Sequence, residues 1–353
     1  MKNRIITLIS AVFILFIGSL FTSCRSTEQA PGSIPLPTEK PTAENQDEYV
    51  MYTGQYEELK DSVEKQSIVV WEKDSKFWLR YKEKDYEIQR MEQHQFLFAS
   101  NRLLDSNSVI FAGIQENRAT VCKIGTYLFS RVFSTVDTIP ILPKGAVQSA
   151  IKANRSQAVN LPSKEKTLIS LLFLQPSIQH NIRLANSNNP LHEALIAFKK
   201  PYLAEESAKA LAKVEESLQQ EGLSLVIYQA YLPLYVEQTY YQLVLSMNIE
   251  KAFHETYKKN LFSTGCAVDV GLFDQKAQQF IDMGSHYLDD TNESMLTYFG
   301  GTSLQRYYRQ LLHALMYKNG FKPYSSYWWG YLYQTNDPMP SMQQEIAEEL
   351  PSS

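Results

Sequence analysis

Residues 261–270, with the sequence LFSTGCAVDV, constrain the fold of this 353-residue chain more than any other stretch. Ala267, Val268 and Val270 predict a buried strand, because a run of apolar residues is typical of one. Asp269 interrupts this run, and burying an unpaired carboxylate is costly. The fold must therefore bring a metal, a basic or hydrogen-bonding partner, or solvent to Asp269.

The N-terminal segment has the pattern of a secretory signal. Lys2 and Arg4 precede an apolar run over residues 5–21, which is the usual order of a charged and an apolar signal region. Residues 20–24, LFTSC, resemble a bacterial lipobox, in which the signal is cut before a cysteine that then receives lipid. We predict a lipoprotein signal peptide over 1–23, lipidation of Cys24 and an extracytoplasmic place on a membrane of the bacterial envelope, with the outer membrane favoured. An uncleaved membrane anchor is the alternative.

The next segments predict a tether and a small β-rich module. Residues 24–48 are rich in Pro, Thr and Glu and predict a flexible tether. Short β-branched and aromatic runs within 49–143 predict a meander or small barrel without a catalytic group, with strands at 67–71, 77–81, 86–89, 95–99, 108–112, 119–124 and 127–133. His94 and Glu92 read as a solvated surface pair rather than a metal site. A polar connector follows over 144–166.

The region 167–336 alternates helices and strands. We expect strands at 168–174, 223–228 and 324–333, helices at 205–220, 233–247 and 305–319, and a flexible acidic tail over 337–353. The chain is thus predicted to be α+β. Its net charge of −4 gives no sign of nucleic-acid binding. Cys122 and Cys266 are expected as two free buried thiols, with a disulfide as the alternative.

Five blocks carry a resemblance to a known family. They are residues 177–185 (SIQHNIRLA), 222–233 (GLSLVIYQAYLP), 261–270, 280–284 (FIDMG) and 319–331 (NGFKPYSSYWWGY). In this order they resemble the bacterial D-alanyl-D-alanine dipeptidases, which include the vancomycin-resistance dipeptidase, over about residues 176–333. The resemblance implies an antiparallel sheet flanked by helices, and one zinc held by two histidines and an aspartate. Such a site leaves a position open for a reactive water.

The departures from the family pattern fall on the catalytic positions. Phe262 and Gly330 stand where the two zinc histidines are expected, Tyr327 replaces the glutamate base and Leu232 replaces an arginine. Asp269 is the one ligand position kept. Since the loss of even one such group costs orders of magnitude in rate, we expect no catalytic residue, no metal and no cofactor, as in a pseudoenzyme. A zinc site rebuilt around Asp269 from relocated ligands is the alternative, with His254, His286 and His313 as candidates.

The same substitutions predict an aromatic remnant of the old site. Its residues would be Tyr231, Phe262, Asp269, Tyr327, Trp328 and Trp329. Collapse into the core is favoured over a groove that binds peptide or sugar. The leading hypothesis is an envelope-anchored lipoprotein that binds or scaffolds at the cell wall (peptidoglycan), through cell-wall peptide or an envelope protein. The alternatives are a divergent zinc dipeptidase and a structural part of an outer-membrane complex that binds its partner through residues 49–143.

Overall fold

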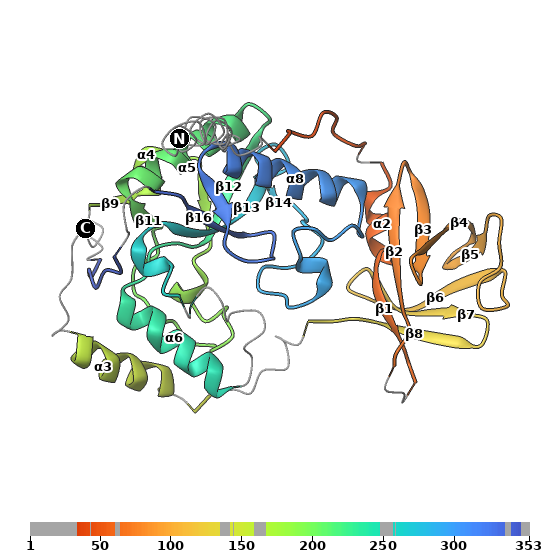
Figure 1. Cartoon of the computed structure of the whole chain (residues 1–353), viewed down its shortest axis with the longest axis horizontal. Coiled ribbons are helices and arrows are strands. Elements are labelled where there is room, and N and C mark those ends of the chain that lie inside the picture. The colour runs from red at the N-terminus through yellow and green to blue at the C-terminus, as the bar shows by residue number, and fades with distance from the viewer. Residues whose placement is uncertain are drawn as a thin grey trace, which may run out of the picture. The chain divides into compact units, whose positions relative to one another are not determined.

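Alternating buried and exposed side chains organise residues 54–131 into a closed barrel of eight antiparallel strands, β1 to β8 (Figure 1). The computed structural model describes residues 34–42, 44–60, 64–134, 142–143, 145–158, 167–247, 257, 259–335 and 340–346. From Pro35 onward the described residues belong to one compact unit. The prediction of an α+β chain with a β-rich N-terminal domain is confirmed.

The barrel strands lie close to the predicted positions. They are β1 (Gly54–Glu58), β2 (Ser67–Lys73), β3 (Lys76–Tyr81), β4 (Lys84–Glu92), β5 (Gln95–Phe98), β6 (Ser108–Gln115), β7 (Arg118–Ile124) and β8 (Tyr127–Arg131), and the helix α2 (Gln46–Tyr52) precedes them. Asp74 and Ser75 both have positive φ, as do Glu116 and Asn117. Two such residues in succession give the turn whose twist matches a tight hairpin.

The C-terminal region contains a sheet with the strand order β10-β12-β13-β16-β15, and β14 pairs with β13. Every residue of β12 is buried, which is typical of a central strand with both faces covered. The sheet is antiparallel, as expected, except for the parallel pair β10–β12 at one edge. The strands of this region are β9 (Leu168–Ser170), β10 (Gln179–His180), β11 (Tyr202–Ala204), β12 (Leu223–Gln229), β13 (Ala267–Asp274), β14 (Gln279–Phe280), β15 (Phe321–Pro323) and β16 (Gly330–Tyr333).

Amphipathic helices accompany this sheet. Helix α5 buries Ala208, Leu211, Val214 and Leu218 along one face, as the 3.6-residue period predicts, and contacts β12. Helix α8 begins at a capping box and contacts α5 and β13. The helices are α3 (Ala146–Ala158), α4 (Leu171–Leu174), α5 (Glu205–Gln219), α6 (Leu234–Ser246) and α8 (Ser303–Lys318), with the 3-10 turns η2 (Arg183–Ala185), η4 (Phe262–Thr264) and η5 (Asn292–Ser294).

Several predicted segments are corrected. The connector 144–166 contains helix α3, which packs against α6. The predicted strand 168–174 turns into helix α4 after three residues, and of the predicted strand 324–333 only Gly330–Tyr333 form a strand, β16. His94 is not a free surface residue, because its Nδ1 atom lies 2.9 Å from the hydroxyl of Tyr52.

The tail also departs from its prediction. Met342 is fully buried, its backbone amide donates to the carbonyl of Ser263, and its carbonyl accepts from Leu234. Burial of an apolar side chain between two backbone hydrogen bonds fixes this segment. The expectation of a flexible tail is therefore wrong for residues 340–346.

The barrel contacts the C-terminal region directly. The amide of Glu72, in β2, donates to the carbonyl of Gly301 at 3.0 Å, and its carboxylate accepts from the backbone amide of Ser303, the first residue of α8. A carboxylate at a helix N-terminus is favoured by the helix dipole.

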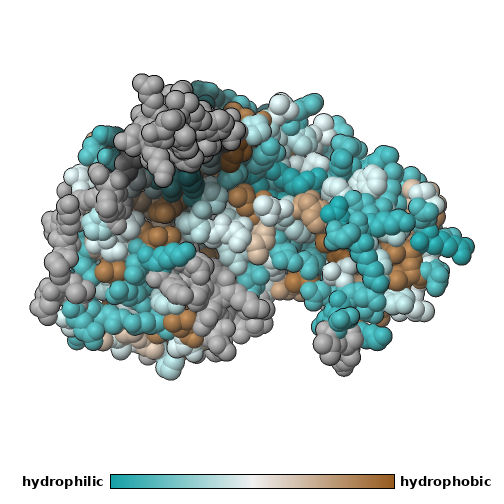
Figure 2. Space-filling view, viewed as in Figure 1, coloured by the Kyte–Doolittle hydropathy of each residue, from teal (hydrophilic) through white to brown (hydrophobic). Residues whose placement is uncertain are grey.

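The surface gives two further observations. Among the described residues no helix is both long and apolar enough to cross a membrane. Figure 2 shows hydrophobic side chains in separate areas among hydrophilic ones on the face it presents. Scattered apolar residues are ordinary for a protein surface.

Candidate functional site

Asp269 lies in the centre of the C-terminal sheet. Strand β13 pairs with β12 on one side and with β16 on the other, and this register places Gly330 opposite Asp269. The side chain is only 2% exposed. The two positions that the dipeptidase resemblance assigns to an aspartate and a histidine ligand are thus neighbours in the sheet.

Two tyrosines satisfy the carboxylate of Asp269. The hydroxyl of Tyr287 donates to Oδ2 at 2.7 Å, and the hydroxyl of Tyr324 donates to Oδ1. Of the alternatives that the sequence left open for Asp269, the structure shows hydrogen-bonding partners. Burial raises the pKa of Asp269 to about 7, and the two hydroxyl bonds oppose that rise.

Phe262 occupies the first histidine position and is fully buried. Its ring centroid lies 5.2 Å from that of Tyr257 and 6.1 Å from that of Tyr324. Glu237 of helix α6 holds this turn, because its carboxylate accepts from the amides of Phe262 at 3.0 Å and Ser263 at 2.8 Å. Burial raises the pKa of Glu237, and these hydrogen bonds oppose the rise, so the pKa is about 8.

The space beside the second histidine position is filled. A Cβ atom built on Gly330 would lie 2.6 Å from the ring of Tyr324. Such an approach does not occur without displacement of one group. Glycine at this position therefore permits Tyr324 to reach Asp269, and a histidine side chain would displace that tyrosine.

The zinc that the resemblance implies does not fit these residues. Both oxygens of Asp269 accept hydrogen bonds, and aromatic rings stand at or over both histidine positions. Across the described parts of the chain, no cluster of three His, Cys, Asp or Glu side chains could hold a metal ion. His286 contributes a backbone amide bond to Asp289, and the ring of His313 lies 6.1 Å from that of Tyr331. His254 lies outside the described residues, as does Cys24.

The other predicted site residues differ in what they contact. Leu232 is fully buried, and Tyr231 points to the tail, where its hydroxyl donates to the carbonyl of Gln344. Tyr327 stacks on Trp329, with ring centroids 4.7 Å apart. Trp329 in turn lies 5.2 Å from Trp328 and 5.5 Å from Tyr287, measured between ring centroids. Ring contacts therefore connect Tyr327, Trp328 and Trp329 to the tyrosine that holds Asp269, whereas Tyr231 bonds to the tail.

Trp328 connects this core to a cavity. Its indole Nε1 donates to the hydroxyl of Ser285 at 3.0 Å, and both residues line a cavity of about 620 Å³ between the barrel and the C-terminal region. Tyr287 lines the same cavity and holds Asp269. The cavity therefore adjoins Asp269 through Tyr287, one of the two tyrosines that hold its carboxylate.

The two cysteines carry no reactive arrangement. Cys122 and Cys266 are both buried, and they form no disulfide in the described part of the chain, as predicted. Burial raises the pKa of the Cys122 thiol, which disfavours the nucleophilic thiolate. The sulfur of Cys266 lies 3.8 Å from the carbonyl of Thr264.

Sequence reasoning missed the residues that complete the site. Tyr287 and Tyr324 hold Asp269, and Arg183 lines the cavity. Arg183 and Tyr324 fall inside two of the family-like blocks. Their place in those blocks was the only sequence feature that pointed to them. Tyr287 lies in a loop beyond those blocks and carried none.

Comparisons with known proteins show the family of this chain. The sequence profile described as D-ala-D-ala dipeptidase matches residues 164–348, slightly more than half of the chain. The D-alanyl-D-alanine dipeptidase of Escherichia coli strain K12 is 30% identical over 164 residues, which cover 46% of this chain and 82% of that enzyme. The chain belongs to the D-Ala-D-Ala dipeptidase family.

Proposed function

We propose that this protein is an envelope-anchored lipoprotein whose dipeptidase-family domain binds cell-wall peptide without hydrolysing it. The observation that carries the proposal is the state of Asp269. Its two oxygens accept from Tyr287 and Tyr324, and the ring of Tyr324 fills the space over Gly330.

The chemistry at these positions supports loss of catalysis. Amide hydrolysis needs an activated water and a group that stabilises the developing oxyanion. Tyr327 stacks on Trp329 at the position of the base, and Leu232 is buried at the position of the arginine. Neither side chain has the charge or basicity for those roles.

The binding half of the proposal is supported by the adjoining cavity. Its volume of about 620 Å³ lies within the range of about 300–1,000 Å³ typical of ligand sites. It is lined by aromatic and polar residues in combination, among them Tyr228, Tyr287, Trp328 and Asn181. Such a lining suits a short peptide better than a purely apolar ligand.

The envelope location is supported by the N-terminal sequence. The charged start, the apolar run and Cys24 together have the order of a lipoprotein signal. A family whose substrates derive from cell-wall peptide fits a chain carried to that compartment. The barrel adds a second folded module on the same chain.

The proposal is tested with the full chain purified in detergent. Release of D-alanine from D-Ala-D-Ala is measured with added zinc, and co-sedimentation with purified peptidoglycan is measured in parallel. We expect sedimentation with peptidoglycan and no release of D-alanine. Turnover that a chelator abolishes would support a divergent zinc dipeptidase instead, and absence of co-sedimentation would refute peptidoglycan binding. The E. coli dipeptidase serves as the positive control for turnover.

A further inference from the structure

The cavity beside Tyr287 is built from both folded modules. Residues of the barrel and of the C-terminal region line it together, among them Arg118, Arg131, Asn181, Arg183, Tyr228 and Tyr287. A ligand there would contact both modules, whereas the filled site around Asp269 lies within the C-terminal sheet alone.

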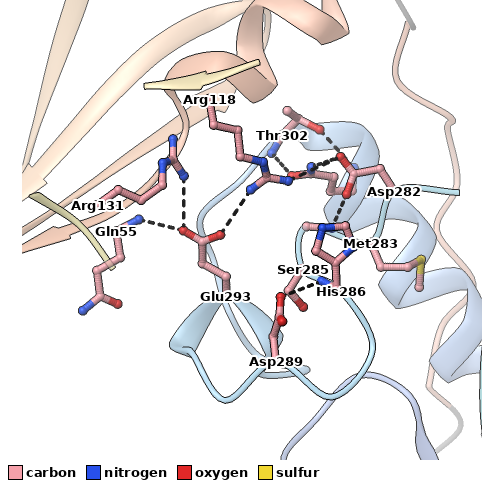
Figure 3. Close-up of polar contacts among 12 residues, drawn as sticks. Gln55, Arg118, Arg131, Asp282, Met283, Ser285, His286, Asp289, Glu293 and Thr302 are labelled. Carbon is pink, nitrogen blue, oxygen red and sulfur yellow. Dashed lines mark hydrogen bonds and ion pairs between the residues drawn. The ribbon is translucent and has the colours of Figure 1, made fainter. Parts of the chain in front are cut away.

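Most of the charged groups of the cavity neutralise one another. Figure 3 shows Glu293 between Arg131 and Arg118, with N–O distances of 3.6 Å to each. Glu293 also accepts from the amide of Gln55 at 2.9 Å, and Arg118 lies 4.0 Å from Asp282. These groups hold the barrel against the C-terminal region and have little capacity left for a ligand.

Arg183 differs from the other two arginines. Its side chain takes part in no ion pair or hydrogen bond with the residues that the structure describes, and its Nε atom is buried without a partner. Its guanidinium carbon lies 5.8 Å from the ring centroid of Tyr228 and 5.9 Å from that of Tyr287. A buried donor without a partner costs free energy that a bound acceptor would recover.

The surroundings of Arg183 orient it for a planar anion. Tyr228 and Tyr287 stack on each other with centroids 4.6 Å apart, so the guanidinium rests against a rigid aromatic pair. Asn181 adds an amide side chain to the same cavity. A guanidinium presents a planar fork of donors that matches a carboxylate in bidentate geometry.

We propose that Arg183 is the anchor of a carboxylate-binding site in this cavity, and that it takes the C-terminal carboxylate of a short peptide. The peptide identity rests on the proposed function, whereas the carboxylate site itself rests on Arg183 and its surroundings. Arg118 and Arg131 of the barrel line the same cavity, so a bound peptide would contact both modules.

The test is isothermal titration of the full chain in detergent with three probes: D-Ala-D-Ala, its C-terminal amide, and acetate. We expect the dipeptide to bind at least about tenfold more tightly than the amide, because a hydrogen bond to a charged group is worth more than one to a neutral group. Arg183→Gln should lose at least about tenfold in dipeptide affinity, and Arg183→Lys should lose less. Arg102→Gln, which removes an exposed arginine of the barrel, should bind as wild type does.

The outcomes separate this inference from the proposed function. Equal binding of dipeptide and amide, unchanged binding by Arg183→Gln, or no binding of any probe would overturn the carboxylate site. Peptidoglycan co-sedimentation could still hold in each case. Acetate binding as tightly as the dipeptide would overturn the peptide as its ligand. Circular dichroism of Arg183→Gln and Arg183→Lys shows whether either variant is misfolded. If only Arg183→Lys is folded, its dipeptide affinity is compared with that of the wild type, and an unchanged affinity overturns the site.

Discussion

Replacing Asp269 with asparagine removes a buried charge while it keeps the shape of the side chain. Both carboxylate oxygens accept from tyrosine hydroxyls, and Asp269 joins none of the ion pairs of the described residues. An asparagine amide can accept from one hydroxyl and donate to the other. The variant therefore isolates the cost of the buried charge.

The size of that cost follows from the pKa. Burial raises the pKa of Asp269 from 3.8 to about 7, so between these values the native chain keeps a proton that the unfolded chain has lost. The stability of the wild type then falls as the pH rises through this window. One pKa unit corresponds to about 1.4 kcal/mol, so Asp269 accounts for a loss of about 3 kcal/mol between about pH 5 and about pH 8.

The assay is urea unfolding of the full chain, followed by tryptophan fluorescence at several pH values. We expect Asp269→Asn to gain about 3 kcal/mol relative to wild type over this range. Glu237, whose pKa is raised to about 8, titrates in both proteins. Its contribution therefore cancels in the difference between their free energies of unfolding. Asp105→Asn, at an exposed position, should follow the wild type. Parallel pH profiles of wild type and Asp269→Asn would refute the reasoning.

Two further substitutions test the packing. Glu293→Gln leaves Arg131, whose side chain is 2% exposed, without its anion, and should lower the free energy of unfolding by about 3 kcal/mol in a urea titration. Glu87→Gln, in an exposed pair, should leave the midpoint unchanged, and equal losses from the two variants would contradict a special role for the buried pair. Gly330→Ala should cost about 1–3 kcal/mol by the same titration, because its Cβ would meet the ring of Tyr324 at 2.6 Å. A neutral result would mean that this ring is free to move.

The barrel was largely predictable because its strands alternate and its turns are polar. Strand β1 was missed because the sequence GQYEE has a single large apolar residue, although Glu58 is buried there. Helix α3 was missed because its sequence, AVQSAIKANRSQA, mixes small and polar residues with few large apolar ones. The tail is held by the buried Met342 and by hydrogen bonds from Tyr231 and Tyr235, and no local sequence pattern predicts these contacts.

The centre of the site was predictable only in part. The sequence predicts that Asp269 needs a partner, because a carboxylate stands in an apolar strand. It does not identify Tyr287 and Tyr324, which approach from segments 18 and 55 residues further along the chain. The cavity likewise depends on contacts between modules far apart in sequence. The partners of Asp269 and the cavity are both set by tertiary packing. The hydrophobic periodicity of a single helix or strand does not predict that packing.

We infer that this domain of the dipeptidase family holds no zinc at the position of Asp269. The most direct measurement is the zinc content of the full chain, determined by mass spectrometry after equilibration with excess zinc and removal of unbound metal. The E. coli dipeptidase and Asp269→Ala are measured alongside. We predict far less than one zinc per chain, unchanged in Asp269→Ala. One zinc per chain that disappears in Asp269→Ala would contradict the account.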